Sequence, residues 1–181
     1  MNKPIFLIGF MGAGKTTLGR ALAARLPRLT YIDLDEEIER HAGMSVSKIF
    51  ATYGEKVFRT MEADALRDVA SLSNVIVGCG GGTPCAEGNM ELMNRCGTTV
   101  LLSARRPTLL RRLLEAQAQR PKLNGMSADE VAAYIDSALA ERAEAYGMAQ
   151  YSFPSDRLEN EAEIEASCRF FIRKFLPGAR S

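Results

Sequence analysis

The stretch Gly9–Thr16, GFMGAGKT, decides the fold that we expect, because it has the spacing G-x-x-x-x-G-K-[ST]. An apolar strand at 4–10 precedes it and an amphipathic helix at 15–26 follows it. Glycines let such a loop wrap closely around a phosphate with its backbone N–H groups pointing inward. The positive end of the following helix attracts the same anion. A chance match in a chain of this length has a probability of about 1%, so the motif predicts nucleotide binding.

The rest of the chain alternates short apolar runs with helical patterns, which favours an α/β fold with a parallel sheet. The predicted strands are 4–10, 30–33, 75–79, 98–102 and 149–153. The predicted helices are 15–26, 35–42, 45–52, 55–72, 86–95, 106–117, 127–147 and 160–175. Ser127, with Glu130 three residues later, predicts a capping box for the seventh helix. The stretch between Glu115 and Met126 lacks an apolar period, and we expect a surface segment that can move.

Size and composition exclude several classes of protein. The 181 residues fit one domain, 1–181, and the net charge of +1 gives no overall attraction to nucleic acid or to an anionic membrane. No apolar run approaches the roughly 20 residues of a membrane helix, and the apolar start is too short for a secretory signal peptide. The four cysteines lack C-x-x-C spacing and indicate neither zinc nor a disulfide framework. We therefore expect a cytoplasmic protein and, without a heptad pattern, a monomer.

Two aspartates follow the second predicted strand. Asp33 and Asp35 are two residues apart, so on a strand they would project to the same side. They would lie at the carboxyl end of the sheet, where ligands bind. Such carboxylates can hold Mg²⁺ or accept a proton from an attacking hydroxyl. Alternatively, Asp35 only caps the helix that begins at Glu36. Because the strand 98–102 ends without an acid, we assign Asp33 to the metal.

Gly80–Gly82 follow the third predicted strand and also lie at the ligand-binding edge. They allow close approach of the backbone to a ligand, or positive φ, although a plain tight turn uses the same residues. Arg59, Arg120 and Arg142 offer the forked donors that suit a carboxylated substrate. The residue pattern alone does not separate them from solvated surface arginines.

In order and spacing these segments resemble the shikimate kinase family, from Ile5 to about Phe153. The segments that carry the resemblance are Gly12–Thr17, Asp33–Asp35, Gly54–Arg59, Gly80–Gly82, Arg120–Pro121, and Arg142 with Tyr146. The resemblance implies a three-layer α/β/α P-loop kinase fold with a five-stranded parallel sheet of order 2-3-1-4-5. It also implies a substrate-binding region at about 34–62 and a lid at about 112–126.

The implied reaction is phosphorylation of the 3-hydroxyl of shikimate by Mg-ATP, giving shikimate 3-phosphate and ADP, in the synthesis of chorismate and the aromatic amino acids. By likeness to the family, the catalytic residues would be Lys15, Asp35 and Arg120, and Mg²⁺ would be held by Thr16 and Asp33. The ATP-binding residues would be Gly12, Ala13, Gly14, Lys15, Thr16, Thr17 and Arg120. The shikimate-binding residues would be Asp35, Arg59, Gly80, Gly81, Gly82 and Arg142. The family usually has an arginine beside adenine after the fifth strand, and Arg157 is in about that place.

Three other functions remain open at this point. The first is a kinase of another hydroxylated acid, such as gluconate, and the second is a nucleoside monophosphate kinase. The third is a nucleotide-binding regulatory module without catalysis. The presence of Lys15, Asp33 and Asp35 disfavours the third.

Overall fold

A computed structural model describes residues 3–177, so residues 1–2 and 178–181 of the predicted domain lie outside the described residues. Five strands form one sheet in the order β2-β3-β1-β4-β5, and every neighbouring pair is parallel. The strands are β1 (Ile5–Ile8), β2 (Thr30–Asp33), β3 (Val75–Gly78), β4 (Thr98–Ser103) and β5 (Tyr151–Pro154). The predicted α/β class and strand order are confirmed.

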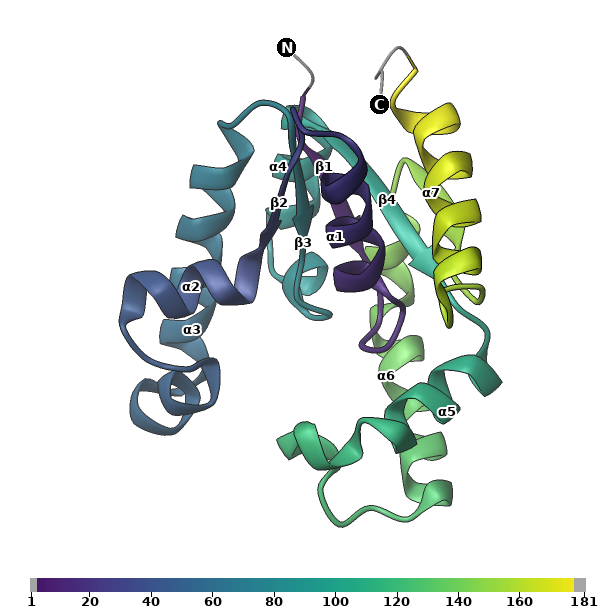
Figure 1. Ribbon diagram of the computed structural model, residues 1–181. Coiled ribbons are helices and arrows are strands. Elements are labelled where there is room, and N and C mark those ends of the chain that lie inside the picture. The colour runs from purple at the N-terminus through teal and green to yellow at the C-terminus, as the bar shows by residue number, and fades with distance from the viewer. Residues whose placement is uncertain (1–2, 178–181) are drawn as a thin grey trace.

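Helices cover both faces of the sheet, which gives the three layers (Figure 1). They are α1 (Lys15–Arg25), α2 (Leu34–Ala42), α3 (Val46–Ala70), α4 (Asn89–Cys96), α5 (Arg106–Glu115), α6 (Ala128–Gly147) and α7 (Glu161–Phe175). Helices α1 and α7 pack together on one face, and α3 and α4 pack together on the other. Compared with the predicted helices, α4 begins three residues later, after Gly88.

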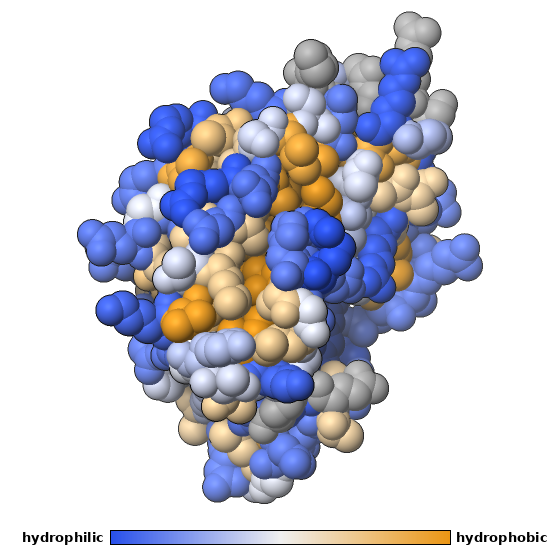
Figure 2. Space-filling view, turned by 90° about the vertical axis from the view of Figure 1, so that its left-hand side faces the viewer, coloured by the Kyte–Doolittle hydropathy of each residue, from blue (hydrophilic) through white to orange (hydrophobic). Residues whose placement is uncertain are grey.

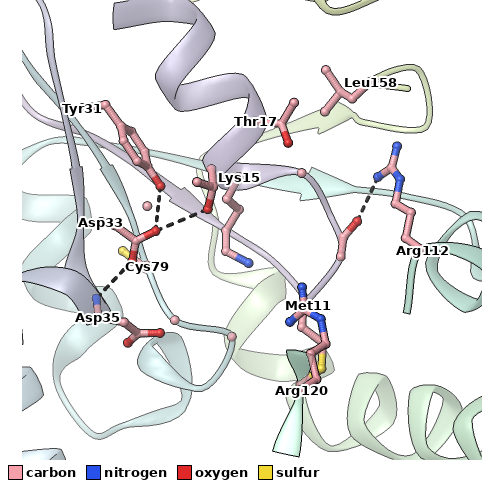
Figure 3. Close-up of a pocket in the computed structure, with 16 residues that line it drawn as sticks. Met11, Lys15, Thr17, Tyr31, Asp33, Asp35, Cys79, Arg112, Arg120 and Leu158 are labelled. Carbon is pink, nitrogen blue, oxygen red and sulfur yellow. Dashed lines mark hydrogen bonds between the residues drawn. The ribbon is translucent and has the colours of Figure 1, made fainter. Parts of the chain in front are cut away.

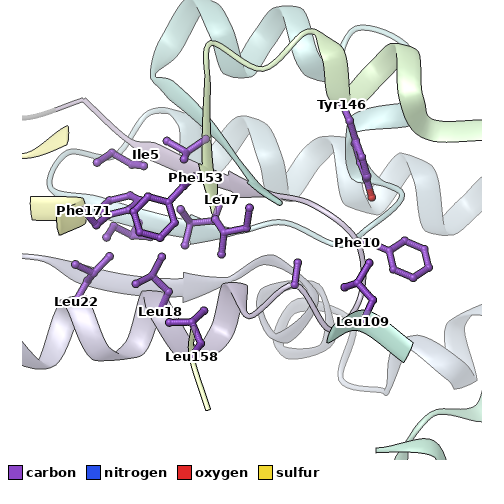
Figure 4. Close-up of a cluster of buried hydrophobic side chains, with 14 of the residues drawn as sticks. Ile5, Leu7, Phe10, Leu18, Leu22, Leu109, Tyr146, Phe153, Leu158 and Phe171 are labelled. Carbon is purple, nitrogen blue, oxygen red and sulfur yellow. The ribbon is translucent and has the colours of Figure 1, made fainter. Parts of the chain in front are cut away.

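The side chains of β1 alternate between the two hydrophobic clusters of the core. Ile5 and Leu7 pack in the cluster beneath α1 and α7, which Figure 4 shows with side chains of β5. Phe6 and Ile8 pack in the cluster beneath α3 and α4. All four side chains are at most 4% exposed. A central parallel strand is covered on both faces, which explains why β1 is apolar at every position.

Gly54 interrupts helix α3. Its φ of 76° and ψ of 175° lie in a region that is essentially restricted to glycine. The helices predicted at 45–52 and 55–72 are the two halves of α3 on either side of this kink. The second half carries Arg59, so Gly54 sets the direction of the helix that bears a predicted site residue.

We expect Gly54→Ala to lower the free energy of unfolding by about 1–3 kcal/mol, because alanine is strained at this φ and ψ. A Cβ at Gly54 would meet nothing within 4 Å, so backbone strain is the whole effect. Gly147 in α6 also has open space around it, but its φ is not positive. Gly147→Ala should therefore raise the free energy of unfolding, by up to about 1 kcal/mol. Urea denaturation measures both variants, and a change of the same sign in the two would contradict this account.

The segment between α5 and α6 forms two short 3₁₀ helices, Gln117–Gln119 and Pro121–Leu123. Leu123 is fully buried, so the expectation of a surface segment is wrong at this residue. The Gln117 side chain donates to the carbonyls of Leu123 and Met126, at 2.7 Å each. The buried Leu123 side chain and the two hydrogen bonds of the Gln117 amide thus hold this segment against the protein, although its sequence has no apolar period. The predicted capping box at the start of α6 is present.

The surface around α2 and α3 mixes apolar and polar side chains. Figure 2 shows this side of the molecule, where groups of apolar residues are separated by hydrophilic ones. Tyr53 and Val57 of α3 are among the exposed large hydrophobic residues. Within residues 3–177, no helix combines the length and the apolar character that crossing a membrane requires.

Candidate active site

The loop after β1 depends on three glycines. Gly9, Gly12 and Gly14 have φ of 139°, 80° and 91°, in the region that favours glycine. A Cβ at Gly9 would also lie 2.6 Å from the carbonyl oxygen of Leu102. Because Gly14 is the N-cap of α1, the unpaired backbone N–H groups of the first helical turn lie at the end of the loop. This geometry favours the binding of an anion.

A cavity of about 350 Å³ lies along this loop (Figure 3). Ten predicted site residues line it: Gly12, Gly14, Lys15, Thr16, Thr17, Asp33, Asp35, Gly80, Gly81 and Arg120. The other lining residues, for which the sequence predicted no role, are Met11, Tyr31, Gly78, Cys79, Arg112 and Leu158. Four predicted site residues do not line the cavity: Ala13, which is buried, and Arg59, Gly82 and Arg142.

Lys15 lies inside its own loop. Its Nζ donates to the carbonyls of Gly9 at 2.7 Å and Phe10 at 3.0 Å. Burial lowers the pKa of the Lys15 ammonium to about 8. An anion beside the group favours its charged form, so a phosphate in the loop would oppose this shift.

Asp33 is fixed through both of its carboxylate oxygens (Figure 3). Oδ2 accepts from the hydroxyls of Tyr31 at 3.0 Å and Thr16 at 3.3 Å. Oδ1 accepts from the backbone N–H of Asp35 at 3.2 Å, which makes Asp33 the N-cap of α2. The alternative that Asp35 caps this helix is therefore wrong, and the Asp35 carboxylate is free of that task.

The carboxylate of Asp35 has the properties of a base at near-neutral pH. Burial, followed by the charge of Asp33, raises the pKa of Asp35 from 3.8 to about 6. At pH 7 the group is mostly ionised, yet it can take up a proton readily. It lines the cavity on the side of Gly80.

Three predicted site residues have side chains close to the glycine triplet, Gly80–Gly82. The distances from an added Cβ are 3.2 Å to Asp35 Oδ1 at Gly80, 2.9 Å to Arg142 Nη1 at Gly81 and 3.0 Å to Arg59 Nη2 at Gly82. None of the three glycines has positive φ, so of the two uses that the sequence allowed, positive φ is not the one found. The glycines leave room for these three groups, because a side chain at any of them would press on the end of Asp35, Arg142 or Arg59.

Arg59 is held by two acids of its own helix. Its Nη1 donates to Glu62 Oε2 at 2.9 Å, and its Nη2 donates to Glu55 Oε1 at 3.0 Å. Glu62 is 1% exposed and also accepts from the hydroxyl of Thr83 at 2.7 Å. Glu62 thereby fixes Arg59 relative to the turn after the triplet. Glu62 was not among the predicted site residues, and its only signal in the sequence was its spacing of three residues from Arg59.

Two arginines carry buried nitrogens that lack a hydrogen-bond partner among residues 3–177. These atoms are Nη1 of Arg142 and Nε of Arg120. The Arg142 guanidinium lies over the ring of Phe10, 5.3 Å from the centroid. Beside it, the hydroxyl of Tyr146 donates to the Gly81 carbonyl at 2.8 Å. Guanidinium donors without partners next to a cavity can bind an anionic ligand.

Arg112 of α5 links the loop to the segment after β5. It donates to the Gly12 carbonyl at 2.9 Å, to Glu159 at 2.8 Å and to the Ser155 carbonyl at 2.9 Å. Arg157, which the sequence suggested for the adenine side, lines a separate pocket beside α7 and is 84% exposed. The arginines that line the described cavity are Arg112 and Arg120.

The sequence matches one known family over most of its length. A family model described as "Shikimate kinase" matches residues 11–172. The chain belongs to the shikimate kinase family. The shikimate kinase of Bacteroides thetaiotaomicron is 47% identical over 163 residues, which cover 90% of this chain and 93% of that protein. The shikimate kinase of Chlorobium limicola is 37% identical over 174 residues, which cover 93% and 86%.

Solved shikimate kinases share the fold. The crystal structure of the Bacteroides thetaiotaomicron shikimate kinase has a TM-score of 0.90 at 44% identity, covering 94% of this chain and 97% of the other. The shikimate kinase of Acinetobacter baumannii, solved in complex with shikimate, has a TM-score of 0.80 at 30% identity, covering 96% and 93%. The predicted family is confirmed, and the shikimate kinase alternative prevails over the other three that the sequence left open.

Proposed function

We propose that this enzyme transfers the γ-phosphoryl group of ATP to the 3-hydroxyl of shikimate, giving shikimate 3-phosphate and ADP for chorismate and aromatic amino acid synthesis. The observation that carries the proposal is the contact of the glycine triplet with one carboxylate and two guanidinium groups beside a phosphate-binding loop. Shikimate offers matching chemistry, namely hydroxyl groups and a carboxylate. The related Acinetobacter kinase, solved with shikimate, supports the same substrate.

The shikimate carboxylate binds between Arg59 and Arg142, and Gly80, Gly81 and Gly82 let it approach. The unpartnered Nη1 of Arg142 supports this assignment. Arg59 is preset by its bond to the buried Glu62. A preset guanidinium loses less side-chain freedom when the ligand binds. In this reading the region at about 34–62 supplies Asp35 and Arg59, and the lid at about 112–126 supplies Arg120.

The ATP phosphates bind to the loop residues Gly12, Ala13, Gly14, Lys15, Thr16 and Thr17. Because shikimate occupies the Asp35 side, the nucleoside extends the other way, toward Arg112 and Leu158, which line the cavity. Arg112 joins the phosphate-binding loop to the segment after β5 on this side of the cavity, through its hydrogen bonds to the Gly12 and Ser155 carbonyls.

The donor set at the end of β2 fits Mg²⁺. The Thr16 hydroxyl and the Asp33 carboxylate are hard oxygen donors 3.3 Å apart at the cavity that Lys15 also lines. Mg²⁺ commonly uses only one or two protein groups besides water and phosphate oxygens. Thr16 and Asp33 would hold the ion, which when bound neutralises charge on the β- and γ-phosphates.

The side chains contribute mainly position and charge to the transfer. Asp35 orients the 3-hydroxyl toward the γ-phosphorus and accepts its proton, for which a pKa of about 6 is suitable. Lys15 and Arg120 stabilise the charge that develops on the transferred group. Closure of the lid excludes water, which would otherwise compete as the attacking nucleophile.

We further propose that the enzyme works as a monomer in the cytoplasm, on small molecules rather than on nucleic acid or membranes. The net charge of +1 supports the choice of small substrates, because it gives no long-range attraction to polyanions.

A coupled ADP-release assay with Mg-ATP tests the proposed substrate. Shikimate is the candidate acceptor, beside gluconate, AMP and a control without acceptor. Shikimate alone should give fast release above the control. Release with gluconate or AMP, and none with shikimate, would keep the phosphate chemistry and overturn the substrate.

A further inference from the structure

Tyr31 of β2 is bonded to the proposed metal site, although the mechanism above does not use it. Its hydroxyl donates to Asp33 Oδ2 at 3.0 Å, the oxygen that also accepts from Thr16 at 3.3 Å (Figure 3). The other oxygen of Asp33 accepts from the Asp35 N–H. Three hydrogen-bond donors therefore define the orientation of the Asp33 carboxylate. Of the three residues that supply them, Tyr31 is the one to which the proposed mechanism gives no role.

The Tyr31 ring occupies a slot that two glycines leave open. A Cβ at Gly19 of α1 would overlap with the ring, and a Cβ at Gly78 of β3 would overlap with the hydroxyl. Both neighbours are thus small where the phenol passes between α1 and β3. The slot guides the hydroxyl to the cavity, whose lining includes Tyr31. Packing against Gly19 and Gly78 on its two sides therefore holds the Tyr31 side chain in the position from which it contacts Asp33.

We propose that Tyr31 is a positioning residue, which holds Asp33 in the orientation that supports Mg²⁺ beside Thr16. The inference rests on the metal role proposed for Asp33. Donors that bond to metal-supporting side chains typically change metal affinity by about 10–100-fold when removed. Asp33 keeps two other donors in the absence of the phenol, so we expect an effect of about tenfold.

The test is Tyr31→Phe, which keeps the ring in its slot and removes only the hydroxyl. Calorimetric titration with ADP, at a series of Mg²⁺ concentrations and in EDTA, measures how the ion strengthens nucleotide binding without any turnover. The Mg²⁺ concentration at half-maximal effect should rise about tenfold. The ADP affinity in EDTA and the KM for shikimate should stay at the wild-type values. An unchanged Mg²⁺ requirement would overturn the inference.

Two further variants separate the possible failures. Tyr151→Phe removes an exposed hydroxyl from β5, at the other edge of the sheet, and should behave as wild type. Asp33→Asn should raise the Mg²⁺ requirement more than Tyr31→Phe does. If Asp33→Asn raises it and Tyr31→Phe does not, the role of Tyr31 is wrong and that of Asp33 stands. If neither variant raises it, the metal role of Asp33 is wrong as well.

Discussion

Asp35→Asn should lower the turnover of shikimate by about 10²–10⁴-fold, because asparagine cannot accept the proton of the 3-hydroxyl. ADP binding should remain close to that of the wild type. The N-cap of α2 is the Asp33 side chain, which bonds the backbone N–H of residue 35, so the substitution leaves the cap in place. Steady-state ADP release and calorimetry measure the two effects. Near-normal turnover would refute the role assigned to Asp35.

The same substitution should stabilise the free protein at neutral pH. Burial, and then the charge of Asp33, raise the pKa of the Asp35 carboxyl from 3.8 to about 6, so its ionisation at pH 7 costs roughly 1–3 kcal/mol. A group whose pKa is raised by folding favours the folded state at low pH and loses that contribution as the pH rises through its folded pKa. The other charged groups around it are Lys15, Glu39 and Glu62.

The gain from Asp35→Asn should therefore be complete above about pH 6 and absent below about pH 4, since the wild-type carboxyl is neutral there. Urea denaturation of both proteins at pH 4 and pH 7.5 measures it. A gain that is larger at pH 4 would show that burial does not raise the pKa of this group.

Arg142→Ala should raise the KM for shikimate by about 30-fold or more and leave the KM for ATP unchanged. Removing one partner of a buried, charged hydrogen-bonded pair costs about 2–5 kcal/mol, of which the lower end already exceeds a tenfold change. Arg142→Lys should give a KM for shikimate between those of the wild type and Arg142→Ala, because lysine keeps the positive charge but lacks the paired donors of the guanidinium. Kinetics with each substrate varied in turn measure the split.

Arg106→Ala is the matched control for Arg142→Ala. Arg106 pairs with Asp136 at 2.6 Å, and both side chains are about half exposed. Exposed pairs of this kind contribute at most about 1 kcal/mol to stability, so neither KM should change. An equal rise in the KM for shikimate in both arginine variants would remove the specific role of Arg142.

Local sequence predicted the elements of the fold, because each signal acts within a few residues. The loop Gly9–Thr16 satisfies its pattern through Gly9 and Gly14 at fixed spacing, and all three glycines of the loop have positive φ. The capping box at Ser127 likewise involves only the first turn of α6. Strand order came from the family resemblance and not from any local pattern.

The parts of the site that the sequence missed depend on contacts between distant segments. Arg112 meets the Gly12 carbonyl across 100 residues of chain. No local sequence pattern distinguished Arg112 from Arg157, which lies after the fifth strand, about where the family resemblance implies an arginine beside adenine. The sequence predicted that the glycine triplet is part of the site, but not that it makes room for Asp35, Arg59 and Arg142. These three residues come from three separate helices, so no local pattern brings them together.

The choice between Asp33 and Asp35 as helix cap also exceeded local patterns. Either aspartate could have capped a helix that begins within three residues of β2. The structure selects Asp33, whose orientation is set by the hydroxyl of Thr16 on α1 and by that of Tyr31 on the same strand, β2.

The most direct test of the central claim is ³¹P NMR of the products formed from Mg-ATP and shikimate. We predict ADP and one new phosphomonoester in equal amounts, with the phosphorus coupled to the proton on carbon 3 of shikimate. Inorganic phosphate and ADP alone, or a phosphate on another oxygen of shikimate, would contradict the account.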